Sequence, residues 1–238
     1  MKRFWDSAAA AIDADGWRVL LDGRPVRLPD GPPLLVGRRA LAEAIAAEWQ
    51  VAGGAKDGDM SYADVPLTRI AGTAQLRIAP DPEPIALELA RYGGSDLLCY
   101  RATHPDALVQ REHAAWQPWL DWAERRTGAR LNVTSGVMHV TQPDASLAAL
   151  AQAVAACDPL VLAGLGLAVP ALGSLVLGLA MAAGALDADT AHDLTTLDEV
   201  FQEQLWGRDA EAAARRARVL AELGVANRFM TLAQATDA

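Results

Sequence analysis

Cysteine and histidine are scarce in this chain, which limits the disulfide and metal chemistry it can support. Its 238 residues include two cysteines and four histidines. Cys99 and Cys157 stand far apart among apolar neighbours, so we expect two buried thiols in a reducing compartment and neither a disulfide nor a metal pair. No two histidines have the i,i+4 spacing of a helical metal site. We therefore expect no metal ion and no other cofactor.

Catalytic sequence motifs are also missing. The chain has no Walker loop, no GxSxG elbow, no CxxC pair and no HExxH pair. The Gly164-Leu165-Gly166 segment lacks the third glycine and the preceding strand of a dinucleotide fingerprint. The acidic run from Asp187 has Ala191 and His192 where a calcium loop needs a ligand and a glycine. These motifs therefore identify no catalytic residue.

Clusters of basic residues are absent, and the net charge is -9. A nucleic-acid partner is therefore excluded, because neutralising phosphates requires grouped Lys and Arg. Between residues 159 and 186 no side chain is charged, a length that makes a membrane span worth testing. Glycines and Pro170 interrupt the segment, and no Lys or Arg within twenty residues flanks it. We expect two buried helices, 158–165 and 170–184, and no stable membrane insertion; a peripheral membrane protein is the alternative.

The first eighty residues have the pattern of a small α+β domain. Asp22-Gly23 separates two β-prone runs, 17–21 and 24–28, which is typical of a type I′ hairpin. Residues 34–36 add a third short strand. The large apolar residues that recur every four positions, and so share one face of the helix that follows, are Leu41, Ile45 and Trp49. The predicted domain is a two-layer antiparallel sheet plus helix, spanning residues 1–80.

Beyond the breakers at 81–84 the pattern is almost entirely helical. Helices are predicted at about 106–126, 144–157, 188–206 and 209–235, in addition to the two apolar helices. The β-prone segments 131–134 and 137–140 form either an isolated hairpin or a return to the first sheet. The predicted fold class is therefore α+β, with the small N-terminal domain followed by a larger all-α helical bundle domain, residues 81–238.

The densest polar group lies between residues 197 and 209. On a helix Glu199, Glu203 and Trp206 share one face, and Asp198 lies beside Gln202. The apolar residues expected to form the buried stripe are Leu194, Leu197, Phe201 and Leu205. Three interpretations stay open: an acid/base pair, a docking face with Trp206 as its anchor, or a solvated face. In the third, the acids meet nearby arginines, Gly207 ends the helix and Asp209 caps the next one.

Tryptophan is over-represented relative to the other aromatic residues, with seven Trp against three Tyr and three Phe. Trp116, Trp119 and Trp122 recur every three residues around Pro118, which favours core contacts over a ligand groove. Trp49 lies on the apolar face of its helix. We expect Trp49 to have a structural role.

Eight short blocks occur in an order that resembles the ATP12 family, the assembly chaperones of the F1 sector of ATP synthase. The blocks are residues 2–5, 21–26, 48–49, 66–69, 96–102, 116–122, 173–177 and 197–209. The resemblance extends over nearly the whole chain. Small departures from the family pattern occur at Val65, Leu28 and Gln75.

The resemblance implies a non-enzymatic, monomeric chaperone that binds the free α subunit of F1. The chaperone would cover the α/β interface of that subunit until the β subunit replaces it, and it would need no ATP hydrolysis. The partner-binding residues expected on this basis are Glu199, Gln202, Glu203, Trp206 and Asp209, with Asp198 and Trp49 in structural roles. The chain begins at the family motif, which indicates a bacterial cytoplasmic protein. The alternative is a small-molecule-binding protein or enzyme that uses Glu199 and Glu203.

Overall fold

The computed structural model describes residues 1–29 and 31–236, which divide into two compact units. The first unit comprises Met1–Pro82, Asp158–Gly164 and the residues from Arg228 onward. The second comprises Glu83–Cys157 and Leu165–Asn227. Helices α6 (Pro159–Leu172) and α10 (Ala210–Gln234) contribute residues to both units. The division into domains at residues 1–80 and 81–238 stays a prediction.

An antiparallel sheet forms one layer of the first unit. Its strands are β1 (Ala8–Asp13), β2 (Gly16–Leu21), β3 (Arg24–Pro25) and β4 (Leu35–Val36). Strand β2 is central: β1 pairs along its whole length, whereas β3 and β4 pair with its two ends on the opposite side. The hairpin at Asp22-Gly23 and the third strand are confirmed. Strand β1 is not predicted from the sequence, because its four consecutive alanines have low strand propensity and only β2 fixes them as a strand.

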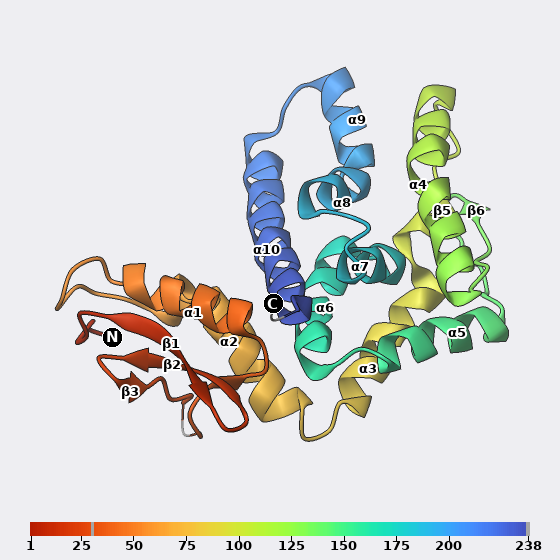
Figure 1. The fold of residues 1–238 in the computed structure, drawn as a ribbon. Helices are drawn as coiled ribbons and strands as arrows, with labels where there is room; N and C mark the ends of the chain where they lie inside the picture. Colours follow the sequence, from red (N-terminus) through yellow and green to blue (C-terminus); the bar gives the residue numbers. More distant parts are fainter. Residues whose placement is uncertain (30, 237–238) are drawn as a thin grey trace. The chain divides into compact units, whose positions relative to one another are not determined.

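Helix α1 (Arg39–Val51) covers one face of this sheet, as Figure 1 shows. Leu41, Ile45 and Trp49 all turn inward and are at most 4% exposed, which confirms the predicted helical face. Helix α2 (Pro66–Thr73) has Pro66 in its first turn and continues as a π-helical segment, Ala74–Ile78. The result is the predicted two-layer α+β arrangement.

The second unit is almost entirely helical (Figure 1). Besides parts of α6 and α10, its helices are α3 (Glu83–Ala90), α4 (Asp106–Thr127), α5 (Asp144–Ala155), α7 (Leu175–Ala182), α8 (Ala188–Thr195) and α9 (Leu197–Trp206). Its short 3-10 turns are Arg91–Ser95 and Leu97–Cys99. The predicted α+β class with a helical C-terminal part is confirmed.

The predicted helix break at Pro170 is wrong. Helix α6 continues through Pro170 and ends at Leu172. The next residue, Gly173, has a φ of 62°, in the left-handed region, which stops the helix. Ser174 then caps α7 by accepting a hydrogen bond from the Leu177 N–H. None of the helices in the described part of the chain is both long and apolar enough to cross a bilayer.

Two further sequence expectations need correction. The segment 131–140 forms neither an isolated hairpin nor a strand of the first sheet: β6 (Thr134–Ser135) pairs in parallel with β5 (Tyr100–Arg101). The single helix expected over 188–206 is two helices that meet at Thr196, whose side chain donates to the His192 carbonyl. Both outcomes depend on contacts between residues far apart in sequence or on a local cap, neither of which periodicity reports.

Neither cysteine forms a disulfide, and the two differ in burial. Cys99 is fully buried, and burial raises the pKa of its thiol to about 12, which makes it unreactive at neutral pH. Cys157 is only half-buried, so the expectation of two buried thiols holds for Cys99 alone.

Candidate functional site

The predicted partner-binding residues lie on α9 and at the start of α10. Gly207, with φ of 97°, ends α9. Two residues later the Asp209 carboxylate accepts hydrogen bonds from the Glu211 and Ala212 N–H groups, at 2.8 and 3.3 Å. Asp209 is therefore the N-cap of α10, where its negative charge is also favourable to the helix dipole.

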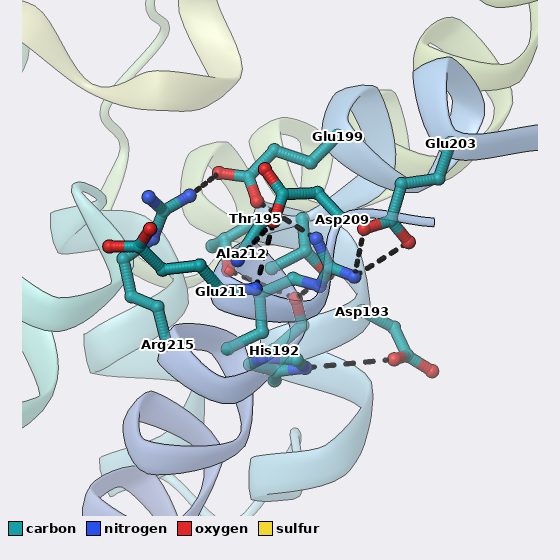
Figure 2. A network of polar contacts seen from close by, with 11 residues as sticks. His192, Asp193, Thr195, Glu199, Glu203, Asp209, Glu211, Ala212 and Arg215 are labelled. Carbon is teal, nitrogen blue, oxygen red and sulfur yellow. Dashed lines mark hydrogen bonds and ion pairs between the residues drawn. The ribbon is translucent and has the colours of Figure 1, made fainter. Parts of the chain in front are cut away.

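Four charged side chains join α9 to α10, and we call them the α9–α10 clasp: Glu199, Glu203, Arg215 and Arg216. The Arg216 guanidinium donates to both carboxylate oxygens of Glu203 at 2.7 Å and to Glu199 at 3.1 Å. Arg215 donates to the other oxygen of Glu199 at 2.9 Å, as Figure 2 shows. Repulsion between the two glutamates at i,i+4 is thereby offset, and the clasp carries no net charge.

Burial separates the clasp into an inner and an outer pair. The Arg216 and Glu203 side chains are 12% and 19% exposed, whereas those of Glu199 and Arg215 are 45% and 58% exposed. The hydrogen bonds that Arg216 donates to the Glu203 carboxylate are the main reason that the pKa of Arg216 is raised. The inner pair therefore holds α9 against α10, and the outer pair is accessible to a partner.

Replacing Arg216 by alanine is expected to destabilise the second unit by about 2 kcal/mol, because the largely buried Glu203 carboxylate loses both hydrogen bonds. Arg218→Ala is the matched control, since the Arg218 side chain is exposed and has no ion-pair partner among the described residues. Urea unfolding followed by circular dichroism measures both variants. Equal stability of the two would show that the inner pair contributes nothing.

The outer face of α9 exposes apolar groups. The Trp206 side chain is 79% exposed, Leu205 is 59% exposed and Val200 is 36% exposed. The prediction that Leu205 belongs to the buried stripe is therefore wrong. Phe201 and Leu194 are buried as expected, and Arg111 of α4 lies over the Phe201 ring at 5.2 Å while hydrogen-bonding Gln204. Arg111 thus contacts α9 at Phe201 and Gln204, whereas Leu205, one turn beyond Phe201, is exposed to solvent.

The predicted site residues thus fall into distinct environments. Glu199 and Glu203 meet on Arg216, and Asp209 faces the backbone of α10. Gln202 and Trp206 are exposed and have no side-chain hydrogen bond to any residue that the structure describes. On α10 a hollow of about 460 Å³ is lined by Arg208 and by alanines 210, 213, 214 and 217. Neither the hollow nor the exposure of Leu205 was predicted from the sequence. The i,i+3,i+4,i+7 spacing of the alanines is the sequence signal that could have indicated the hollow.

Asp198, expected to be structural, lies beside buried charged groups. One of its carboxylate oxygens is buried without a hydrogen-bond partner in the described part of the chain. Glu112 of α4 is 1% exposed and accepts a hydrogen bond from the Ala102 N–H at 2.7 Å. Burial is the main cause that raises the pKa of Glu112, and the negative charge of Asp198 raises it further.

Asp198→Asn is expected to lower the pKa of Glu112, because the variant removes the charge that opposes ionisation of this carboxyl. The fall should be partial, since burial is unchanged. Carbon-detected NMR titration of the Glu112 carboxyl measures the shift. Asp193→Asn is the control. The Asp193 side chain is 86% exposed, and this variant should leave the pKa of Glu112 unchanged. An unchanged Glu112 titration in Asp198→Asn would contradict the electrostatic coupling.

Trp49 lies in the core of the first unit. Its indole N–H donates to the Thr68 hydroxyl at 2.8 Å, and its carbonyl accepts from the Trp5 indole at 2.9 Å. The neighbouring Glu48 carboxylate accepts from the Leu67 and Thr68 N–H groups, which caps the start of α2. These contacts are the basis for proposing a structural role for Trp49.

Nothing in the described chain gathers three or more His, Cys, Asp or Glu side chains in a geometry that could hold a metal ion. The chemistry that the α9 region offers is accordingly that of a surface: an exposed aromatic and aliphatic pair, an exchangeable ion pair and a small-residue hollow. Such a combination is typical of protein–protein contacts.

Comparison with known proteins gives consistent matches. The ATP12 chaperone protein family matches residues 2–124. The structure of Atp12 from Paracoccus denitrificans superposes with a TM-score of 0.92 at 43% identity, covering 98% of each chain, and a point mutant of that protein gives 0.92 at 42% with the same coverage. Protein atp12, mitochondrial, from Schizosaccharomyces pombe is 22% identical over 218 residues, which are 87% of this chain and 74% of that protein. This chain belongs to the ATP12 chaperone family.

Proposed function

We propose that this protein, as an ATP12-family chaperone of F1 ATP synthase assembly, binds the unassembled α subunit and shields its α/β interface until the β subunit replaces it. Family membership supports a chaperone and not an enzyme. An isolated ring subunit exposes a large, partly apolar interface that aggregates unless it is covered. The similarity to a bacterial protein supports the further proposal that the chaperone acts in the bacterial cytoplasm, as a monomer.

The observation that carries the proposed binding surface is the exposure of Leu205 and Trp206 at the end of α9. Removing a large apolar side chain that is this exposed costs the protein little folding free energy, so folding does not account for the presence of these residues. Tryptophan is the residue most enriched at the energetic centres of protein interfaces. We therefore place the centre of the α-subunit contact at Trp206, with Gln202 and the hollow of α10 beside it.

The α9–α10 clasp supplies the polar rim of this surface. Glu199 is held by two arginines, yet nearly half of its side chain is exposed. A basic side chain of the α subunit can replace Arg215 as the partner of Glu199. The displaced Arg215 is 58% exposed and would be solvated by water, and Arg216 would keep its pairing with Glu203. Exchange of one ion pair for another changes the free energy little, which suits a chaperone that must later release its client.

Co-expression of the chain with its F1 α subunit, followed by affinity purification, tests the proposal. The expected result is a complex of the two proteins that dissociates when purified β subunit is added. In a parallel assay, the chaperone should keep the isolated α subunit soluble at a concentration where the subunit alone precipitates. Failure to co-purify and failure to prevent precipitation would overturn the α-subunit assignment.

A further inference from the structure

A second surface feature lies in the first unit and shares no residue with α9. A pocket of about 500 Å³ opens beside the β3 end of the sheet, and its walls include Phe4, Val26, Trp49 and Tyr62. We call it the aromatic pocket. Its volume is in the range that holds one large side chain or a small ligand. Because all of its lining residues belong to the first unit, the pocket exists within that unit alone.

The walls of the aromatic pocket are preorganised yet exposed. The Phe4 ring packs edge-on against Trp5, and Trp5 packs in the same way against Trp49, with 5.1 Å between ring centres in both cases. Trp5 and Trp49 are buried, whereas Phe4 is 57% and Tyr62 is 41% exposed. A rigid aromatic surface that faces water gains free energy when an apolar group covers it, and it loses little conformational entropy in doing so.

Two arginines, Arg24 and Arg27, also line the pocket. Both are exposed, and neither has an ion-pair partner among the residues that the structure describes. Two arginines of the same unit do form ion pairs, Arg18 with Asp13 and Arg39 with Glu43. In a chain with a net charge of -9, two cations that lack an ion-pair partner among the described residues place positive charge beside this apolar pocket.

We propose that the aromatic pocket binds a segment of a partner polypeptide in which a large apolar side chain stands next to one or two carboxylates. The apolar side chain enters between Phe4 and Tyr62, and the carboxylates pair with Arg24 and Arg27, whose planar guanidinium groups bind carboxylates in two-pronged fashion. A polypeptide is the occupant because the chain belongs to a chaperone family. The inference concerns a site separate from α9 and does not depend on which protein is the client.

Two fluorescein-labelled heptapeptides test this site on the full chain: Gly-Ser-Asp-Phe-Asp-Ser-Gly and the same peptide with lysine in place of both aspartates. Fluorescence anisotropy should show binding of the acidic peptide at least about tenfold tighter than that of the basic one. The double variant Arg24→Glu with Arg27→Glu should reverse this preference. A gain of binding to the basic peptide cannot result from misfolding, so the reversal is decisive.

Three controls complete the design. Arg69→Glu changes an exposed arginine of α2 outside the pocket and should leave both affinities at the wild-type values. Tyr62→Ser should weaken the acidic peptide, and so should replacing its phenylalanine by glycine. Equal binding of the two peptides, or an acidic peptide unaffected by the double variant, would overturn the proposal. Sedimentation that revealed a dimer lost in the double variant would also overturn it, because the occupant would then be a second copy of this chain.

Discussion

Trp206→Ser is expected to weaken capture of the F1 α subunit by about a hundredfold while leaving the chain folded. The Trp206 side chain is 79% exposed, so its removal from the free protein uncovers almost no core. If its ring is the centre of the proposed interface, truncation costs about 2.8 kcal/mol of binding free energy, which corresponds to the hundredfold loss. Surface plasmon resonance measures the loss of affinity, with the chaperone immobilised and the α subunit titrated over it.

Met138→Ser is the matched control for Trp206→Ser. Met138 is 77% exposed, lies in the same unit and is far from α9 in sequence, so it removes a comparable amount of apolar surface elsewhere. We expect wild-type capture by this variant. Capture by Trp206→Ser at wild-type affinity would rule out the end of α9 as the contact, and equal weakening in both variants would show that general surface hydrophobicity is responsible.

Asp96→Ala is expected to produce the largest loss of stability, about 3 kcal/mol of unfolding free energy. Asp96 is fully buried, and its carboxylate accepts hydrogen bonds from the Leu98 and Val176 N–H groups and from the Ser174 hydroxyl, at 2.8 to 3.1 Å. It therefore ties the 3-10 turn after Ser95 to the start of α7. Alanine leaves three buried donors without an acceptor, which outweighs the relief from no longer burying a charge.

The pH dependence of this loss has a definite sign. Burial is the main cause that raises the pKa of Asp96 above its ordinary value, against the opposing effect of its hydrogen bonds. The stability that Asp96 contributes by titration is therefore complete below the ordinary pKa and is lost as pH rises through the folded-state pKa. The deficit of Asp96→Ala should accordingly shrink with rising pH.

Urea unfolding at several pH values measures the deficit of Asp96→Ala. Asp187→Ala is the control, because Asp187 is an exposed cap of α8 that accepts one hydrogen bond from the Thr190 N–H. Its loss should be about 1 kcal/mol, typical of a helix cap. A deficit for Asp96→Ala no larger than that of Asp187→Ala would show that the buried carboxylate does not hold the two segments together.

Local patterns predicted the elements whose partners are close in sequence. The Asp22-Gly23 hairpin and the face shared by Leu41, Ile45 and Trp49 both appear as expected. Each depends on turn chemistry or helical periodicity, which a few consecutive residues specify. The family resemblance likewise required only the order of short blocks, and the comparisons confirm it.

The candidate site was only partly predictable. Helical spacing placed Glu199 and Glu203 on one face, and Asp209 was foreseen as a cap in one of the open interpretations. The choice between an acidic surface and a neutralised one depended on Arg215 and Arg216, which are sixteen and thirteen positions from the acids they bind. Leu205 was misassigned because the helical pattern identifies a face but not which face a neighbouring helix covers.

The sequence by itself determined the family, the succession of an α+β portion and a helical portion, and the absence of known catalytic motifs. These follow from local residue patterns and their order. Only the tertiary structure decided that four alanines form strand β1, that α6 continues through Pro170, and that Trp206 and Leu205 face solvent. These features arise because pairing, burial and exposure are fixed by residues distant in the chain. A local pattern supplies the propensity of a segment, and its long-range neighbours determine the outcome.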